Sequence, residues 1–113
     1  MTTPVALAPG QIHWAFLEPV GGREQGGRRP VLVVSSDRFL EVVDTLVAVV
    51  PITSVDRGWG NHVGLGELQG RPSWAMTEQV RTLSRSRLRG QVGTAPAAAM
   101  AEVWTWLRES LGL

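Results

Sequence analysis

The sequence contains no cysteine, no lysine and no tyrosine among its 113 residues. Without cysteine, neither a disulfide nor a thiolate metal site can form, which agrees with a reducing cytoplasm as the expected compartment. The N-terminus begins Met1-Thr2-Thr3-Pro4 and lacks the basic and apolar segments of a signal peptide. No apolar run is long enough to span a bilayer, so the sequence predicts no association with a membrane.

The length and composition limit the domain organisation. Hydrophobic residues make up 43% of the chain and charged residues 19%, which is typical of a globular protein. Two domains would each bury too little core to be stable. We therefore expect one domain over residues 1–113. Residues 1–9 contain two prolines and several small residues, and they are expected to form a loose leader.

The basic residues are all arginine, 11 in total, although the formal net charge is only +1. Genomic base composition is sufficient to explain the preference for arginine over lysine. Whatever the cause of the bias, arginine is suited to bind phosphate, because a guanidinium offers a rigid fork of donors. One group of arginines lies within residues 81–89 and a second within residues 23–29. This distribution indicates a local anion site, not a uniformly cationic surface.

The hydrophobic pattern predicts a sheet of short strands. Ile12, Trp14 and Phe16 alternate with their neighbours as in a strand, and residues 31–34 and 45–50 are β-branched runs typical of buried strands. The other expected elements are loops over residues 18–30 and 55–61 and short strands around residues 62–65, 73–83 and 89–92.

The C-terminal segment is predicted to be a helix. Its apolar stripe at helical spacing consists of Met100, Val103, Trp104, Leu107 and Leu111. Thr94 is a suitable N-cap, Pro96 is tolerated in the first turn, and Gly112 fits the C-terminal end. Trp106 lies off the stripe, and we expect it to pack against a partner subunit. The expected architecture is a strongly bent antiparallel sheet followed by one packed helix.

Searches for common chemical motifs find no metal or cofactor site. There is no Cys/His cluster for zinc, no phosphate-binding loop ending in Lys-Ser/Thr, and no GxSxG. The histidines are His13 and His62. His13 lies in a predicted strand and is expected to be structural, whereas His62 follows a loop and is expected to be exposed. A two-histidine ribonuclease mechanism is possible by count, but the spacing gives it no support.

The most informative segment runs from the glycine-rich loop at residues 21–27 into the buried run that begins at Val31. Pro30 favours an extended backbone at Arg29, so a guanidinium at the mouth of a strand can be aimed by the sheet. Glu24 can pair with Arg29 and set its rotamer. An exposed Arg–Glu pair of this kind otherwise contributes little to stability. The residues alone do not decide between an anion-binding role for Arg29 and a surface pair that contributes little.

Several segments in order resemble the MazF/PemK family of toxins. The run from Glu24 to Ser35, Glu-Gln-Gly-Gly-Arg-Arg-Pro-Val-Leu-Val-Val-Ser, is similar to the family signature. The other similar segments are Gly10-Gln11-Ile12-His13-Trp14, Pro51-Ile52-Thr53-Ser54, and Glu78-Gln79-Val80-Arg81-Thr82 followed by Ser86-Arg87-Leu88. The first is fairly specific, and the order and spacing of the set strengthen the others.

This resemblance implies a mainly β fold with a C-terminal helix, an SH3-like partly open barrel that is usually a homodimer. It also implies sequence-selective cleavage of single-stranded RNA without a metal, and inhibition by a co-expressed acidic antitoxin. The catalytic residues carry over to Arg29 and Thr53, with Glu24 in support. The RNA-binding candidates, from the resemblance and from their place in loops or arginine clusters, are Gln25, Arg28, Ser54, Arg57, Trp59, Gln79 and Arg81.

Three positions depart from the family pattern. Gln11 stands where the family commonly has aspartate, Phe16 where it has Asp or Asn, and Glu78 where it has Asp. The first two are expected beside the cleft, so they bear on substrate choice or on activity. They do not change Arg29 or Thr53.

The implied reaction needs no metal, because RNA carries its own nucleophile in the 2′-hydroxyl. An arginine side chain is not readily deprotonated, so Arg29 is not expected to act as the general base. Its expected roles are a clamp on the phosphoryl oxygens and a donor of a proton to the leaving group. Thr53 can donate a hydrogen bond to the same group. The general base remains open among Glu24, a water molecule and a phosphate oxygen of the substrate.

Two alternatives of other classes remain at this point. The same barrel occurs in CcdB-type toxins, which bind gyrase without catalysis, but those lack the Glu-Gln-Gly-x-Arg-Pro loop and usually end in Trp-Gly-Ile. The present chain ends Leu111-Gly112-Leu113. A non-catalytic SH3-like module that binds RNA or a peptide is the second alternative.

Overall fold

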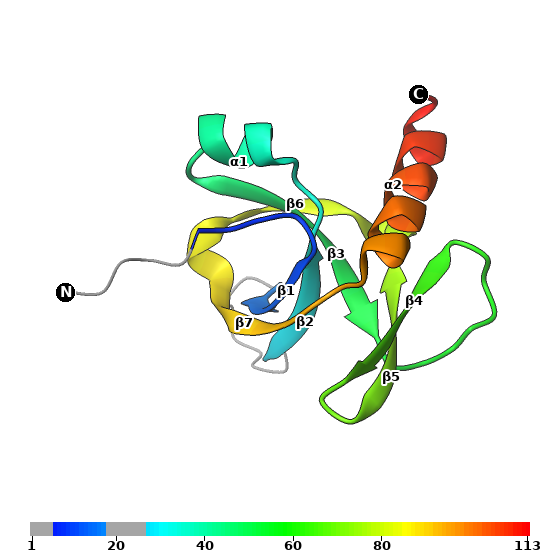
Figure 1. Cartoon of the computed structure of the whole chain (residues 1–113). Coiled ribbons are helices and arrows are strands. Elements are labelled where there is room, and N and C mark those ends of the chain that lie inside the picture. The colour runs from blue at the N-terminus through cyan, green and yellow to red at the C-terminus, as the bar shows by residue number, and fades with distance from the viewer. Residues whose placement is uncertain (1–5, 18–26) are drawn as a thin grey trace.

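A computed structural model describes residues 6–17 and 27–113 of the chain. In this part, seven strands are accompanied by two α-helices and two 3₁₀ turns (Figure 1). The elements are β1 (Gln11–Phe16), β2 (Arg28–Val33), α1 (Asp37–Val42), β3 (Leu46–Thr53), β4 (His62–Leu68), β5 (Arg71–Met76), η2 (Thr77–Gln79), β6 (Arg81–Ser84), η3 (Arg85–Arg87), β7 (Leu88–Thr94) and α2 (Ala97–Leu111).

The strands form one antiparallel sheet in the order β4-β5-β3-β2-β1-β7, and β6 also pairs with β3. The sheet curls into a partly open barrel, with the β4–β5 hairpin extending from one side (Figure 1). Strand β3 joins the two parts: residues 46–49 pair with β6, and Ile52 and Thr53 pair with β5. The mainly β barrel with a C-terminal helix is therefore confirmed.

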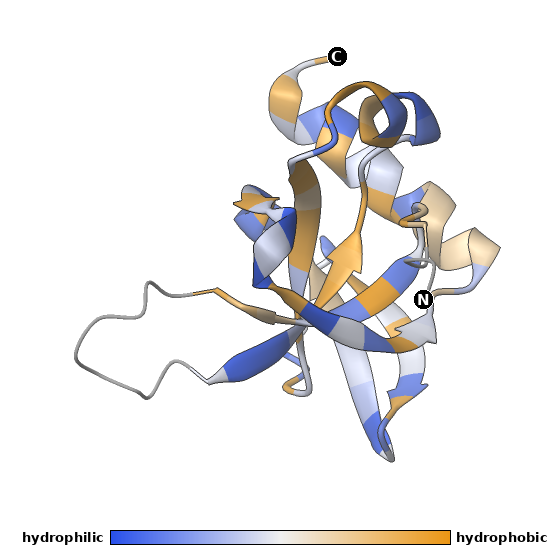
Figure 2. Cartoon of the chain, turned by 90° about the vertical axis from the view of Figure 1, so that its left-hand side faces the viewer, coloured by the Kyte–Doolittle hydropathy of each residue, from blue (hydrophilic) through white to orange (hydrophobic). Residues whose placement is uncertain are grey.

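Strands β2 and β3 are buried on both faces, which explains their continuous apolar runs. On one face, Leu32 packs in a core with Val103 of α2. On the other face, Val31 and Val33 pack in a second core with Leu40 of α1. Figure 2 shows hydrophobic stretches on the central strands, while β2 begins with hydrophilic residues beside the grey segment.

Helix α2 packs against the first core, as the apolar stripe predicted. Met100 and Val103 are buried, and the Trp104 indole Nε1 donates a hydrogen bond to the Val34 carbonyl oxygen at 3.1 Å. One detail of the prediction is wrong. The stripe ends at Leu107, because Leu111 is 69% exposed. Trp106 is half-buried and packs partly against the first core of its own chain, and its contact with a partner subunit stays a prediction.

The ends of α2 test the predicted caps. Gly112 adopts the left-handed conformation with φ 74°, and its N–H bonds the carbonyls of the last turn, so the predicted end is confirmed. The predicted N-cap is wrong. Thr94 is the last residue of β7, and the cap position is occupied by Pro96, whose side chain offers no hydrogen bond.

The strand expected over residues 73–83 is interrupted by η2. Ile52 pairs with Ala75 and Val49 pairs with Arg81, so residues 76–80 pass only residues 50 and 51 of β3. The surplus chain folds into a 3₁₀ turn that contains Glu78. This break separates the hairpin from the barrel.

Two further features were not foreseen. Helix α1 follows β2 directly, and its N-terminus is capped by Ser36, whose Oγ accepts the Phe39 N–H at 3.1 Å. Leu7, placed by the sequence in a loose leader, instead packs half-buried against the second core.

Candidate functional site

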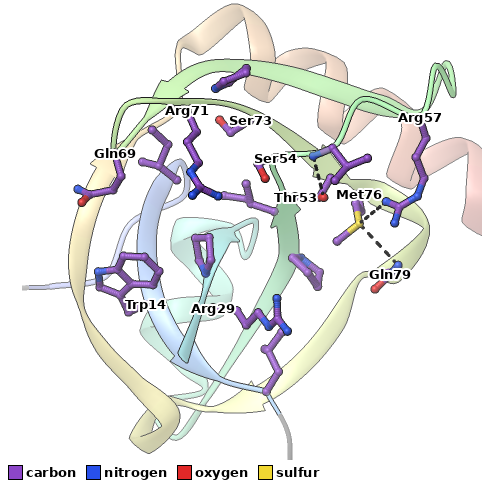
Figure 3. A pocket seen from close by; sticks show the side chains of 17 residues that line it. Trp14, Arg29, Thr53, Ser54, Arg57, Gln69, Arg71, Ser73, Met76 and Gln79 are labelled. Atoms are coloured by element: carbon purple, nitrogen blue, oxygen red, sulfur yellow. Dashed lines mark hydrogen bonds between the residues drawn. The ribbon is translucent and has the colours of Figure 1, made fainter. Parts of the chain in front are cut away.

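A groove of about 680 Å³ opens where the ends of β1, β2 and β3 meet the β4–β5 hairpin (Figure 3). Arg29 and Pro30 line it from β2, Trp14 from β1, and Thr53 from the end of β3. Arg71 lines it from the hairpin. The two residues that the sequence selected for catalysis, Arg29 and Thr53, thus lie in one groove, although they are 24 positions apart in the sequence.

Arg29 is positioned by the paired backbone of β1 and β2. Its backbone pairs with Ala15 of β1, and Pro30 follows it. Its side chain is exposed, and no described residue forms a hydrogen bond or an ion pair with its guanidinium. Its neighbour Arg28 stacks instead over the Trp14 ring, 4.7 Å from the centroid, and does not line the groove. Of this pair, Arg29 is the arginine available to a ligand in the groove.

Thr53 is oriented by its own loop. Its Oγ1 accepts the Val55 backbone N–H at 3.1 Å, which fixes the side chain at the end of β3. The hydroxyl proton remains available for donation. Ser54 also lines the groove, one residue further along. This edge therefore presents a fixed hydroxyl donor to any anion held by Arg29.

Arg57 and Gln79 both line the groove and both contact the Met76 sulfur (Figure 3). Arg57 Nη1 lies 3.9 Å from the Met76 sulfur, and Gln79 Nε2 lies 3.7 Å from the same atom. Sulfur is a weak acceptor, so both groups can exchange this contact for a stronger ligand at little cost. The RNA-binding candidates Arg57 and Gln79 are thus placed on one wall of the groove.

Trp59 lies outside the lining of the groove. It is 52% exposed, and its ring centroid lies 4.8 Å from that of His62. Glu24 and Gln25 lie outside the described residues, so their placement relative to Arg29 is not part of the structure.

The arginines of residues 81–89 bond chiefly to backbone carbonyls. Arg81 Nη2 donates to the Leu17 oxygen at 3.1 Å, and Arg87 Nη1 donates to the Phe16 oxygen at 3.1 Å. Arg89 stacks over the Phe16 ring, 4.8 Å from the centroid. These contacts fix the end of β1, which forms one edge of the groove through Leu17. Much of this cluster therefore supports the barrel.

The two histidines are both buried. His13 Nε2 lies 2.9 Å from the Gln11 side-chain oxygen, and burial lowers the pKa of His13. Gln11, a departure from the family pattern, thus has a partner within β1. The prediction that His62 is exposed is wrong: it is 7% exposed and contacts Glu78. Neither histidine lines the groove.

Arg71 and Ser73 were missed by the sequence analysis. Arg71 lines the groove from the first position of β5, and Ser73 follows two residues later on the same strand. The sequence signal was the isolated Arg71-Pro72 pair after Gln69-Gly70, a turn followed by a cation. The predicted strand began only at residue 73, so Arg71 fell outside it, whereas β5 begins at Arg71.

The fold and this groove define a class: a small curled β-barrel with one packed helix and an arginine-lined groove suited to an anionic ligand. Comparison with protein families then identifies the family. Residues 8–111 match the model of PemK-like, MazF-like toxins of type II toxin–antitoxin systems. The chain therefore belongs to the PemK/MazF toxin family, and a CcdB-type toxin or an unrelated SH3-like module is not favoured.

Individual relatives agree with this assignment. The chain is 31% identical to endoribonuclease MazF of Staphylococcus epidermidis over 108 residues, 92% of this chain and 90% of the relative. It is similar to the crystal structure of MazF (Form-I) from Deinococcus radiodurans, with a TM-score of 0.80, 34% identity, and coverage of 97% and 100% of the two chains. The Form-II MazE–MazF structure from that organism gives a TM-score of 0.82 at 34% identity, with coverage of 97% and 99%.

Within residues 6–17 and 27–113, no three His, Cys, Asp or Glu side chains come together as metal ligands. No helix in this part of the chain is long and apolar enough to cross a membrane.

Proposed function

We propose that this toxin is a metal-independent, sequence-selective endoribonuclease that cleaves single-stranded RNA in the groove, with Arg29 and Thr53 at the scissile phosphate. The observation that carries the proposal is that these two side chains line the same groove. Membership of the PemK/MazF family and the similarity to endoribonuclease MazF support the activity. Glu24 is proposed to support Arg29 from the adjoining segment.

The reaction uses the nucleophile of the substrate. The 2′-oxygen forms a bond to phosphorus, the bond from phosphorus to the 5′-oxygen breaks, and the products carry 2′,3′-cyclic phosphate and 5′-hydroxyl ends. A base takes the 2′-hydroxyl proton, and the leaving 5′-oxygen gains a proton from Arg29 or from water. Glu24, a water molecule and a phosphate oxygen of the substrate remain the candidates for the base.

Catalysis then depends on alignment and on stabilisation of charge. Arg29 can hold two phosphoryl oxygens through its fork of donors. The Thr53 hydroxyl can donate to one of these oxygens, since its acceptor side is already occupied by the Val55 N–H. A well-placed donor of this kind lowers the barrier by about 3 kcal/mol.

Binding of the rest of the strand is assigned to the polar residues around the groove. Gln25, Arg28, Ser54, Arg57, Gln79 and Arg81 are proposed to contact phosphates or base edges, and Trp59 to stack on a base. Arg57, Ser54 and Gln79 line the groove, whereas Arg81 lies behind Leu17 at its edge. Stacking on Trp59 requires the strand to leave the groove along the Ser54–Asn61 loop.

The partners follow from the family. We infer that a co-expressed acidic antitoxin of the MazE kind inhibits the protein, as the MazE–MazF structure of a relative suggests. We also infer a homodimer, one domain over residues 1–113, and a cytoplasmic location. An acidic segment suits a groove lined by guanidinium groups.

The test is incubation of the purified protein with a long RNA in the presence of a chelator, followed by mapping of the product ends. The wild type should give cyclic phosphate and 5′-hydroxyl ends, and Arg29→Ala and Thr53→Ala should lose them. Arg38→Ala, on the exposed surface of α1, is the matched control and should cleave normally. Normal cleavage by Arg29→Ala, or trapping of gyrase on relaxed DNA without RNA cleavage, contradicts the proposal.

A further inference from the structure

We propose that Arg71 binds a second phosphate of the RNA strand, one that flanks the scissile phosphate, from the wall of the groove opposite Arg29. This inference rests on the proposed function and assigns a substrate-positioning residue that the sequence pattern did not reveal. It predicts that the groove grips the strand at two phosphates, not one.

The position of Arg71 is set by a rigid hairpin. Leu68 and Arg71 pair at the tip of β4 and β5, and the two residues between them, Gln69 and Gly70, both have positive φ, 55° and 79°. Two such residues form the tight turn whose twist matches paired strands. Gln69 has a side chain in a conformation that favours glycine, so the turn is held at some cost in backbone energy. Arg71 is thereby fixed at the hairpin tip.

The hairpin is also braced further from its tip. Ser73 is buried, and its Oγ donates a hydrogen bond to the Gly66 carbonyl oxygen at 2.8 Å across the two strands. Strand β5 continues from this brace to pair with Ile52 and Thr53 of β3. Arg71 is therefore connected to Thr53 through paired backbone, and its place relative to the proposed cleavage site is constrained.

The side chain of Arg71 extends into the groove from the hairpin, and Arg29 lies across the opening (Figure 3). Arg71 is exposed, and no described residue bonds to its guanidinium. The acid of the same hairpin, Glu67, does not line the groove and forms no ion pair with a described residue. An arginine that served only to brace the hairpin would contact a carbonyl or a carboxylate, as Arg81 does at Leu17.

The positive charge of the groove favours a ligand with several negative charges. Among the described residues, three arginines line the groove, Arg29, Arg57 and Arg71, and neither aspartate nor glutamate does. Like charges that share one concave site repel each other, and a ligand with several negative charges relieves this repulsion. An RNA strand supplies one phosphate for each nucleotide, and a guanidinium matches a phosphate in geometry.

A second phosphate contact also has a mechanistic use. In-line displacement requires the 2′-oxygen, the phosphorus and the 5′-oxygen to be aligned, and one clamp at Arg29 leaves the strand free to swing about it. A second anchor at Arg71 restricts that rotation before the reaction, which is the way in which orientation lowers a barrier. Arg71 thus acts on the direction of the strand, not on the reacting atoms.

The experiment measures binding of a short RNA that carries a 2′-O-methyl group at the cleavage nucleotide, so that it cannot react. Arg71→Ala should weaken binding by about tenfold or more, the usual loss for a charge-assisted hydrogen bond. The slope of log affinity against log salt should fall by about 0.7, which corresponds to one phosphate contact on a single strand. Arg71→Lys should keep the slope and regain only part of the affinity, and Arg38→Ala should match the wild type.

Replacement of single phosphates by neutral methylphosphonate then locates the contact. At one flanking position the substitution should weaken binding to the wild type but not to Arg71→Ala, whereas at other positions both proteins should respond alike. A variant with unchanged melting temperature, affinity and salt slope overturns the proposal. So does a variant that loses affinity only for an acidic antitoxin peptide, because Arg71 would then serve the inhibitor.

The outcome for Arg71 is separable from that for the proposed function. If the wild type cleaves RNA and Arg29→Ala does not, while Arg71→Ala binds and cleaves normally, only the second phosphate contact is excluded. If the wild type leaves RNA intact, the nuclease proposal fails first.

Discussion

The Glu78 carboxylate holds the buried His62 imidazole, with both carboxylate oxygens 3.1 Å from Nε2. Asn61 Nδ2 donates to the same carboxylate at 2.8 Å, and Thr77 Oγ1 donates to the Asn61 carbonyl oxygen at 2.8 Å. Together these bonds fasten η2 to the start of β4. They explain the departure at residue 78, since glutamate is one methylene longer than aspartate and extends the reach from η2 to His62. Gln79, on the groove wall, follows directly.

This pair predicts an acid-sensitive step in stability. Partial burial raises the pKa of Glu78, but hydrogen bonds from His62, its own backbone N–H and Asn61 outweigh burial, and the net pKa lies below its ordinary value. A carboxyl group with a lowered pKa in the folded state stabilises the fold above its unfolded pKa, and this contribution is lost as the pH falls through the folded pKa. Glu78→Gln should therefore show a smaller fall in melting temperature between pH 7 and about pH 3 than the wild type.

The control for this prediction is Glu102→Gln, on the exposed side of α2, which should keep the pH dependence of the wild type. Parallel melting curves for Glu78→Gln and the wild type across the acid range would show that the His62 pair does not contribute to the acid response.

A substitution at Leu32 tests the packing of β2 against the core that it shares with α2. Its side chain is fully buried between β2 and α2, so Leu32→Ala should leave a cavity and lower the free energy of unfolding by about 2–5 kcal/mol. Urea titration measures the change. Leu113→Ala, at a position 83% exposed, should stay within about 0.5 kcal/mol of the wild type. Equal midpoints for the two variants would contradict the packing described for β2.

The sequence predicted the parts of the fold that depend on local pattern. The β-branched runs at residues 31–34 and 45–50 became buried strands, because a strand covered on both faces needs no polar alternation. The helical stripe through Met100 and Val103 became α2. In the groove, Arg29 and Thr53 were found through their segments, and the strand pairing of β2 with β3 brought the segments together.

The missed features depend on partners that are distant in the sequence. Buried His62 is paired with Glu78, which lies 16 residues further along the chain. The 3₁₀ turn that contains Glu78 lies between β5 and β6, which both pair with β3. The contact of Arg81 was also missed, because its carbonyl acceptor at Leu17 lies 64 residues away. Composition and periodicity carry no information about such pairs.

Arg85 has a structural role, in contrast to the arginines that line the groove. Its guanidinium donates to the carbonyl oxygens of Leu40 at 2.6 Å, Val43 at 2.8 Å and Leu46 at 3.0 Å, which caps the end of α1. Arg85→Ala should destabilise the protein by about 1.5–3 kcal/mol, because these carbonyls lose a charged donor. Its affinity for RNA under conditions in which it is folded should equal that of the wild type.

Denaturant titration and RNA binding in the same buffer check this prediction. Arg71→Ala is the matched comparison, since it is expected to lose RNA affinity and keep its stability. A loss of RNA affinity in Arg85→Ala without a loss of stability would instead place Arg85 on the RNA path.

Trp59 tests the proposed stacking. Trp59 is 52% exposed and its ring is tilted against that of His62, so a base can stack on the exposed part of the side chain. Trp59→Ala should lower RNA affinity by about tenfold, in line with the usual contribution of a stacked base, and should change the preferred cleavage sites. Trp59→Phe should retain most of both. End mapping on a long RNA provides the readout, and an unchanged cleavage pattern in Trp59→Ala would leave the ring with a packing role alone.

Glu24 is the remaining question of mechanism, because its segment lies outside the described residues and only kinetics can assign its role. If Glu24 takes the 2′-hydroxyl proton, Glu24→Gln should slow the single-turnover rate by about a hundredfold or more. The rise of the rate with pH through the carboxyl pKa should also disappear, since only the deprotonated acid can act as a base. Glu18→Gln, the other carboxylate of residues 18–26, is the control and should keep both. If the rate and pH profile of Glu24→Gln match the wild type, the base is water or a substrate phosphate oxygen, because the protonated guanidinium of Arg29 cannot accept a proton.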